Sequence, residues 1–110
     1  MNLKPETSFE NFQTLDIRVG EIVEVIKVPK KDKLYVFTVD FGFDKPKTIV
    51  SAIAHLVTEQ ELLNVRTCFI LNFPPRNIAG IISEGMILVS EKDGKLFLTA
   101  NKNTPIGAIV

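Results

Sequence analysis

Hydrophobic and polar residues alternate with a period of two along much of the chain, which is typical of β-strands that bury one face. The longest such stretch begins at Ile17 and changes phase near Ile22 and Val23, shortly after Gly20. A change of phase next to a glycine predicts a β-bulge or a tight bend. The other strands are predicted over residues 34–41, 48–53, 67–73, 86–90 and 96–99.

Two short stretches have helical signals instead. Ser8 can cap a helix over about residues 9–14, in which apolar residues share one face. Thr58 opens a T-x-x-E capping box, which predicts a second helix over residues 58–63. Asn64 can end this helix in the left-handed conformation.

The order of these elements predicts the fold. Strands recur at intervals of about ten residues, which is typical of an all-β sandwich or small barrel. A short helix between the third and fourth strands is the layout of the five-stranded oligonucleotide-binding (OB) barrel. We therefore expect an all-β, five-stranded OB-fold barrel with short helices and terminal extensions, formed by one stand-alone domain over residues 1–110.

Composition narrows the class of protein without identifying a partner. The 110 residues carry 13 Lys and Arg and 13 Asp and Glu, so the formal net charge is zero. Strong nonspecific binding to phosphates is not expected from such a balance. No apolar run approaches the ~20 residues that span a bilayer, and no signal peptide is visible at the start. We expect a soluble, cytoplasmic protein without membrane association, in which the single cysteine, Cys68, is a buried core residue.

The sequence offers little for catalysis. His55 is the single histidine, and no nucleophile motif accompanies it, so a surface or capping role is expected. Neither a Walker A loop nor a G-x-G-x-x-G motif is present. Asp16, Asp40 and Asp44 do not have the metal-ligand spacing of an EF-hand. We expect no enzyme activity, no cofactor and no metal site.

Two groups of residues are candidates for binding. Lysines 27, 30, 31 and 33 cluster in or beside the loop after the first strand, where OB folds bind their ligands. These ammonium groups could contact phosphates even in a neutral molecule, although a solvated loop is the alternative. Phenylalanines 37, 41, 43, 69 and 73 could stack on bases, but residues of this kind more often form the core.

The stretch over residues 72–86 is the most unusual part of the chain. It joins two predicted strands through two prolines and two glycines, and it contains a single basic residue, Arg76. A connection of this length is expected either to be functional or to have structure of its own. Its directional hydrogen-bonding groups suit a shaped ligand, such as unstacked bases with exposed edges.

Several blocks of the sequence resemble the tRNA-binding domain family. The blocks lie in the family's order and together extend over most of residues 9–110. They comprise residues 14–20 (TLDIRVG), 32–36 (DKLYV), 39–42 (VDFG), 48–53 (TIVSAI), 72–76 (NFPPR), 78–81 (IAGI) and 83–88 (SEGMIL). The family includes the C-terminal domain of bacterial methionyl-tRNA synthetase and the stand-alone protein CsaA, an export-related chaperone. Residues 72–80 are more similar to CsaA, and other blocks to the tRNA-binding branch.

The resemblance implies an OB barrel that binds tRNA by shape, near the outside corner of the L, as a homodimer built partly from the terminal segments. Carried over by position, the tRNA-binding residues are Lys33, Asn72, Arg76, Ser83 and Met86, with Lys30 and Lys31 as additional candidates for phosphate contacts. Pro74 stands where synthetase-like members usually have lysine, and Glu84 where many have glutamine. The first departure removes a positive charge near the expected surface, and the second adds a negative charge there.

Three interpretations remain open at this point. The first is a non-catalytic tRNA-binding homodimer. The second is a CsaA-like chaperone that binds unfolded or precursor polypeptides, for which an apolar pocket near Phe73, Ile78 and Met86 would be needed. The third is a subunit that associates with an aminoacyl-tRNA synthetase.

Overall fold

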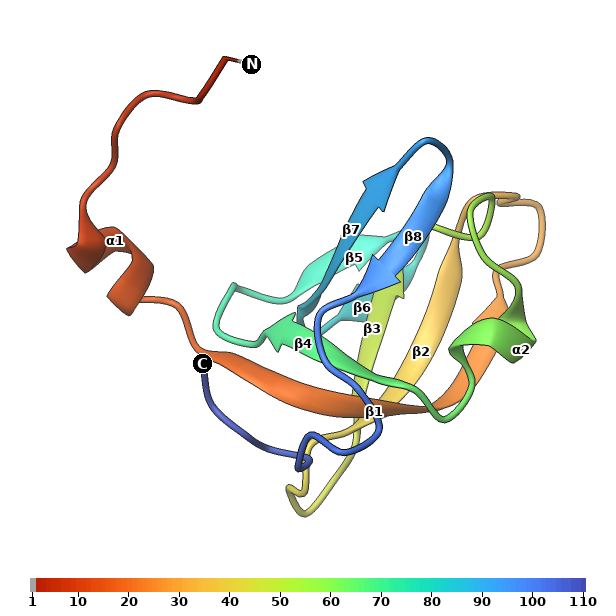
Figure 1. Cartoon of the computed structure of the whole chain (residues 1–110). Coiled ribbons are helices and arrows are strands. Elements are labelled where there is room, and N and C mark those ends of the chain that lie inside the picture. Colours follow the sequence, from red (N-terminus) through yellow and green to blue (C-terminus); the bar gives the residue numbers. More distant parts are fainter. Residues whose placement is uncertain (1) are drawn as a thin grey trace.

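Six antiparallel strands form one sheet in the order β3-β2-β1-β4-β7-β8, and two further strands, β5 and β6, form a separate hairpin (Figure 1). The structure is a computed structural model that describes residues 2–110. Its elements are α1 (Phe9–Gln13), β1 (Ile17–Lys27), β2 (Tyr35–Asp40), β3 (Lys47–Ser51), α2 (Glu59–Leu62), β4 (Arg66–Ile70), β5 (Arg76–Ile78), β6 (Ile81–Ser83), β7 (Met86–Lys92) and β8 (Lys95–Leu98). The predictions of an all-β class and of a helix between the third and fourth strands are confirmed.

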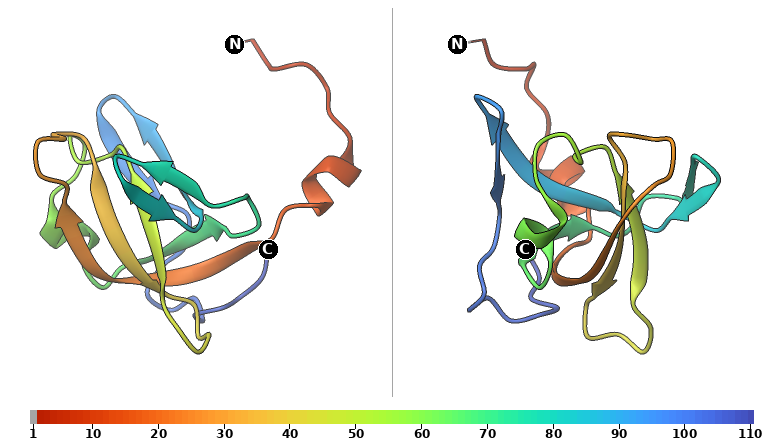
Figure 2. Two further views of the ribbon diagram at one scale, coloured as in Figure 1. Left: turned by 180° about the vertical axis from the view of Figure 1, so that it is seen from behind. Right: turned by 90° about the vertical axis from the view of Figure 1, so that its right-hand side faces the viewer.

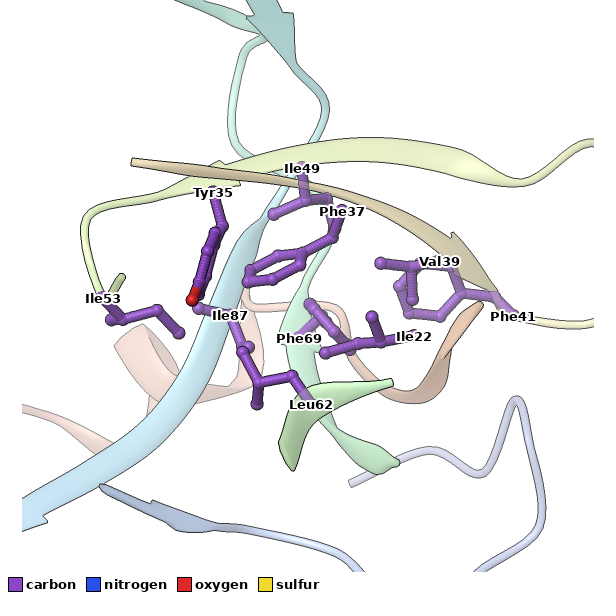
Figure 3. Packing of buried hydrophobic residues seen from close by; sticks show 10 residues of the cluster. All are labelled: Ile22, Tyr35, Phe37, Val39, Phe41, Ile49, Ile53, Leu62, Phe69 and Ile87. Carbon is purple, nitrogen blue, oxygen red and sulfur yellow. The ribbon is translucent and has the colours of Figure 1, made fainter. Parts of the chain in front are cut away.

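The main core lies inside the curled sheet, where alternate residues of β2 meet side chains from β1, β3, β4 and β7 (Figure 3). Phe37, Ile49 and Phe69 are completely buried, and Phe41 is nearly so. Each buried side chain of this size stabilises the fold by roughly 1.5–3 kcal/mol. Three of the phenylalanines that were candidates for base stacking are therefore core residues. Cys68 is buried, as predicted.

The bend of β1 determines how the sheet curls. Residues 21–27 of β1 pair with β2, whereas residues 17–21 pair with β4. The register shifts between Ile22 and Glu24, which confirms the predicted bulge. Close approach of the chains requires glycine just before it, because a Cβ atom on Gly20 would lie 2.5 Å from Val39 Cγ1 and 2.6 Å from Phe41 Cε1.

The free edge of β3 approaches the segment that enters β7. The Glu84 backbone N–H donates to the Thr48 carbonyl at 2.8 Å. The Val50 N–H donates to the Ser83 hydroxyl at 3.0 Å. These hydrogen bonds join the free edge of β3 to the segment between β6 and β7. Within residues 2–110, β3 and β7 do not pair as a β-ladder. Complete closure as a five-stranded barrel therefore stays a prediction.

The second helix forms as its sequence predicts. Both halves of the capping box between Thr58 and Glu61 are present, and Leu62 buries its side chain in the core. Hydrogen bonds from Thr58 hold the pKa of Glu61 below its ordinary value of 4.5. Asn64 adopts the left-handed conformation, with φ of 65°.

The chain ends lie outside the main core. The C-terminal segment runs back along β1, where the Gly107 N–H donates to the Val19 carbonyl at 2.8 Å. It helps to cover a second, smaller apolar cluster around Ile17, Val19 and Cys68. By contrast, α1 stands away from the sheet in Figure 1 and in the left view of Figure 2, and it buries none of its residues. No helix within residues 2–110 is long and apolar enough to cross a membrane.

We predict that Gly20→Ala lowers the free energy of unfolding by about 1–3 kcal/mol, because the added methyl group overpacks the core at the bend. Denaturant unfolding measures the change. The double variant Gly20→Ala/Val39→Ala should cost less than the sum of the single changes, because shortening Val39 removes one of the contacting groups. Strictly additive costs would contradict the proposed close contact.

Candidate nucleic-acid interface

A hollow of about 120 Å³ lies between the end of β3, the β5–β6 hairpin and the start of β7. Its walls combine apolar side chains with a single positively charged group. The lining residues are Val50, Ser51, Phe73, Pro74, Arg76, Ile78, Ser83, Gly85, Met86 and Ile87. We call this hollow the β3–β7 pocket. The apolar residues that a peptide-binding pocket would need, Phe73, Ile78 and Met86, all line it.

The β5–β6 hairpin builds one wall of the pocket. Its two-residue turn has Ala79 at φ 52° and Gly80 at φ 84°, which is the left-handed geometry that matches the twist of paired strands. The Gly80 N–H donates to the side-chain oxygen of Asn77 at 2.9 Å, which further fixes the turn. The stretch over residues 72–86 thus has structure of its own. Strands of three residues are too short to be identified from alternation.

Arg76 and Met86 are the predicted site residues with exposed side chains at the pocket. Arg76 opens β5 and is exposed, and Met86 opens β7 with 50% of its surface exposed. None of the ion pairs described within residues 2–110 uses Arg76, so its guanidinium is available to an anion. Phe73, beside them, is 42% exposed. A free guanidinium next to apolar side chains suits a phosphate together with the face of a base.

Asn72 and Ser83 both use their side chains to bond to backbone groups of the protein, although Ser83 is buried at the pocket and Asn72 is exposed outside it. The side-chain oxygen of Asn72 accepts from the Asp16 N–H at 2.8 Å, and its amide nitrogen donates to the Thr14 carbonyl at 2.6 Å. Asn72 thereby ties the segment before β1 to the end of β4. Ser83 is only 4% exposed, and its hydroxyl accepts from the Val50 N–H and donates to the Gly85 carbonyl. Their hydrogen bonds are already used inside the fold.

The lysine loop, residues 28–34, lies near the same end of β3. The Ala54 N–H donates to the Lys33 carbonyl at 2.9 Å, and Ala54 follows the pocket residue Ser51 by three positions. Lys30, Lys31 and Lys33 are all exposed. The structure therefore brings the loop carrying Lys33 toward the side of the molecule that presents Arg76 and Met86.

The Glu84 side chain contacts the edge of β3, where a lysine partly compensates its negative charge. Its carboxylate accepts from the Thr48 N–H at 3.0 Å and lies 3.8 Å from the Lys47 ammonium. The sequence alone suggested a negative charge beside the binding surface. The nearby lysine partly compensates that charge.

A second hollow, of about 480 Å³, lies between the end of β1 and the start of α2. Lys27, Tyr35, His55 and the segment up to Glu61 line it. The Tyr35 hydroxyl donates to the Val57 carbonyl at 2.7 Å, and burial raises the pKa of Tyr35, with a further contribution from the nearby acidic side chains. His55 is exposed, and no cluster of three metal-ligating side chains occurs among residues 2–110.

Comparisons with known proteins find similar domains and similar complete chains. Residues 17–108 match the family model described as "Putative tRNA binding domain". The methionine–tRNA ligase of Parabacteroides distasonis is 46% identical over 98% of the chain. The chain spans only 16% of that relative's length.

Solved structures extend the similarity to nearly complete molecules. A MetRS-related protein from Pyrococcus horikoshii superposes with a TM-score of 0.88 at 29% identity, covering 97% of this chain and 99% of that one. The chaperone CsaA from Bacillus anthracis gives a TM-score of 0.82 at 27% identity, covering 96% of this chain and 99% of that one.

We predict that Ser83→Ala destabilises the protein by about 1–3 kcal/mol, because the buried Val50 N–H loses its acceptor. Denaturant unfolding measures the change, with Ser90→Ala on the exposed face of β7 as the matched control. The control is expected to stay within about 0.5 kcal/mol of the wild type. A variant at position 83 as stable as the control would show that the hydroxyl is not needed inside the fold.

Proposed function

The chain belongs to the tRNA-binding domain family, and we propose that it acts as a non-catalytic homodimer that recognises tRNA by shape. The observation that carries this proposal is the β3–β7 pocket, with the exposed Arg76 guanidinium beside apolar side chains. The family match extends over the strands that build the pocket. The remaining support comes from the distribution of charge.

Positive charge is local in this molecule. The formal net charge is zero, so attraction to phosphates depends on Arg76 and on the lysine loop. A few phosphate contacts orient a nucleic acid without reading its sequence. Phe73 and Met86 offer an apolar surface to an unstacked base. This combination favours a folded RNA, whose exposed bases and backbone have a fixed arrangement, over a regular duplex.

The exposed faces of α1 and of the C-terminus support a homodimer. Phe9 and Phe12 stack at 6.2 Å between ring centroids, and they are 70% and 45% exposed. Ile109 and Val110 are also mostly exposed. The helix α1 does not pack against the sheet of its own chain, and its apolar side chains are exposed. Such a surface suits an interface with a second copy of the protein. Two copies would present two β3–β7 pockets to one RNA.

A second candidate function uses the same pocket. Its apolar residues also suit the side chains of an unfolded or precursor polypeptide, and a chaperone of the CsaA type is a close structural neighbour. A protein partner such as an aminoacyl-tRNA synthetase is a further candidate, because the chain is similar to one part of a synthetase. The RNA proposal is favoured, since it also uses the free Arg76 and the lysine loop.

We predict that Arg76→Ala lowers the affinity for bulk tRNA about tenfold, because a charge-assisted contact to phosphate is lost. Fluorescence anisotropy at several salt concentrations measures binding, with Lys45→Ala in the exposed β2–β3 turn as the control. Wild-type affinity should fall as salt rises and should survive competition by unrelated duplex RNA. The unfolding midpoint of the variant should equal that of the wild type.

Two results would contradict the RNA proposal. Equal affinities for Arg76→Ala and the control would remove Arg76 from the site. Absence of tRNA binding by the wild type at low salt would overturn the proposed function altogether. Suppression of client aggregation by the same protein would then favour the polypeptide-binding alternative.

We predict that Phe9→Ser/Phe12→Ser converts the dimer into a monomer, because the apolar contact surface of α1 is lost. Sedimentation equilibrium measures the mass. Ile26→Ser is the matched control, since Ile26 is 50% exposed at the far end of β1. A monomeric wild type, or a variant that remains dimeric, would exclude α1 as the interface.

A further inference from the structure

The β7–β8 hairpin presents an exposed face that the β3–β7 pocket does not include. Asp93 and Gly94 form its turn, with φ of 54° and 77°. The resulting register places Lys92 opposite Lys95 and Ser90 opposite Phe97. Because side chains alternate along a strand, these residues share one face of the hairpin. Figure 2 shows the hairpin extending beyond the rest of the sheet.

This face is positively charged although the hairpin as a whole is neutral. Lys92 and Lys95 are direct cross-strand partners, and like charges at such positions are unfavourable. The ion pairs described for residues 2–110 include neither lysine. Glu91 belongs to the opposite face, and its carboxylate accepts from the Gly94 N–H at 3.1 Å. Asp93 occupies the turn itself.

An exposed aromatic ring accompanies the two lysines. Phe97 is 51% exposed and follows Lys95 by two residues, about 7 Å along the strand. The opposite face of the hairpin is the one that packs against the core, through Val89 and Leu96. The ring of Phe97 is therefore not needed to fill the core. An aromatic face beside paired ammonium groups matches a base and its adjoining phosphate.

One residue of the candidate site lies on the same face of β7 as the hairpin lysine. Met86, at the β3–β7 pocket, and Lys92 lie six positions apart in a strand without a register shift. They therefore point to the same side, about 20 Å apart. Leu88, between them on this face, packs against the second apolar cluster, so an RNA that occupies the pocket would pass over that cluster to reach the hairpin.

We infer that the hairpin face formed by Ser90, Lys92, Lys95 and Phe97 is a second RNA-contact surface that takes an unpaired nucleotide. The phosphate lies between the two lysines, and the base stacks on Phe97. This inference rests on the proposed RNA binding and extends it beyond the β3–β7 pocket. It also assigns a ligand to Lys92 and Lys95, which take part in none of the ion pairs described for residues 2–110, and to the exposed ring of Phe97.

The test compares variants of the whole chain in their binding to bulk tRNA. Phe97→Leu should lower affinity at least fivefold, about the smallest effect expected from losing a stacked base, whereas Phe97→Tyr should retain it. Lys92→Gln/Lys95→Gln should reduce the slope of log affinity against log salt by about 0.7, the value for one phosphate contact on an unpaired strand. Lys45→Gln/Lys102→Gln removes two exposed lysines elsewhere and is the matched control. Circular dichroism and sedimentation establish that each variant keeps its fold and mass.

The outcomes separate this inference from the proposed function. Unchanged binding by the Phe97→Leu and double-lysine variants, with weakened binding by Arg76→Ala, would overturn the hairpin surface and leave the pocket intact. A change of oligomeric mass in Phe97→Leu, with no loss of affinity per dimer, would assign Phe97 to a protein interface and also overturn it. Wild-type protein that fails to bind tRNA would remove both proposals together.

Discussion

Close contact between Gly20 and the side chains of Val39 and Phe41 is the constraint on which the arrangement of the sheet depends. It allows β1 to bend over the core and to pair with β2 along one half and β4 along the other. The bend brings β7, through β4, around toward the free edge of β3. The β3–β7 pocket lies where these margins meet. The packing of a single glycine is thus linked to the geometry of the candidate site.

The proposed binding to RNA depends on the local arrangement of basic residues and not on the net charge of the molecule. Opposite charges balance over the whole chain, but several acidic groups are engaged within the fold. Asp16 pairs with Arg18, and Glu21 pairs with Arg66. Glu84 lies near Lys47. Arg76 takes part in none of the ion pairs described for residues 2–110, so it and the exposed lysines of the loop are available to an anionic ligand. A binding surface of this kind selects an RNA whose shape reaches several separated contacts, because no single patch holds it strongly.

The sequence predicts the features of this fold that depend on neighbouring residues. The bulge in β1, the capping box at Thr58 and the left-handed Asn64 follow from local spacing, and the structure confirms them. The β5–β6 hairpin was not identified, because its strands are too short to show a period. The orientation of Ser83 could not be predicted either, since it depends on a partner in β3 that is remote in sequence.

The phenylalanines also show what local sequence cannot predict, because some of them are buried and others are exposed. Alternation predicts that most of them fill the core, but it does not identify the exceptions. Phe73 is exposed because it follows β4 and lies at the pocket. Phe43 is exposed in the turn after β2, where the Arg18 guanidinium lies 5.5 Å from its ring centroid. Exposure of these rings is a tertiary property, and the candidate site therefore required the structure.

The most direct test of the central claim is to map the tRNA contact on the protein by NMR, following each backbone amide during titration with bulk tRNA. The largest changes are expected at Val50, Ser51 and the segment 73–86, with further changes in the lysine loop. Amides of α2 should change little. Changes concentrated around α2 and His55, with the β3–β7 pocket unaffected, would contradict the proposed interface.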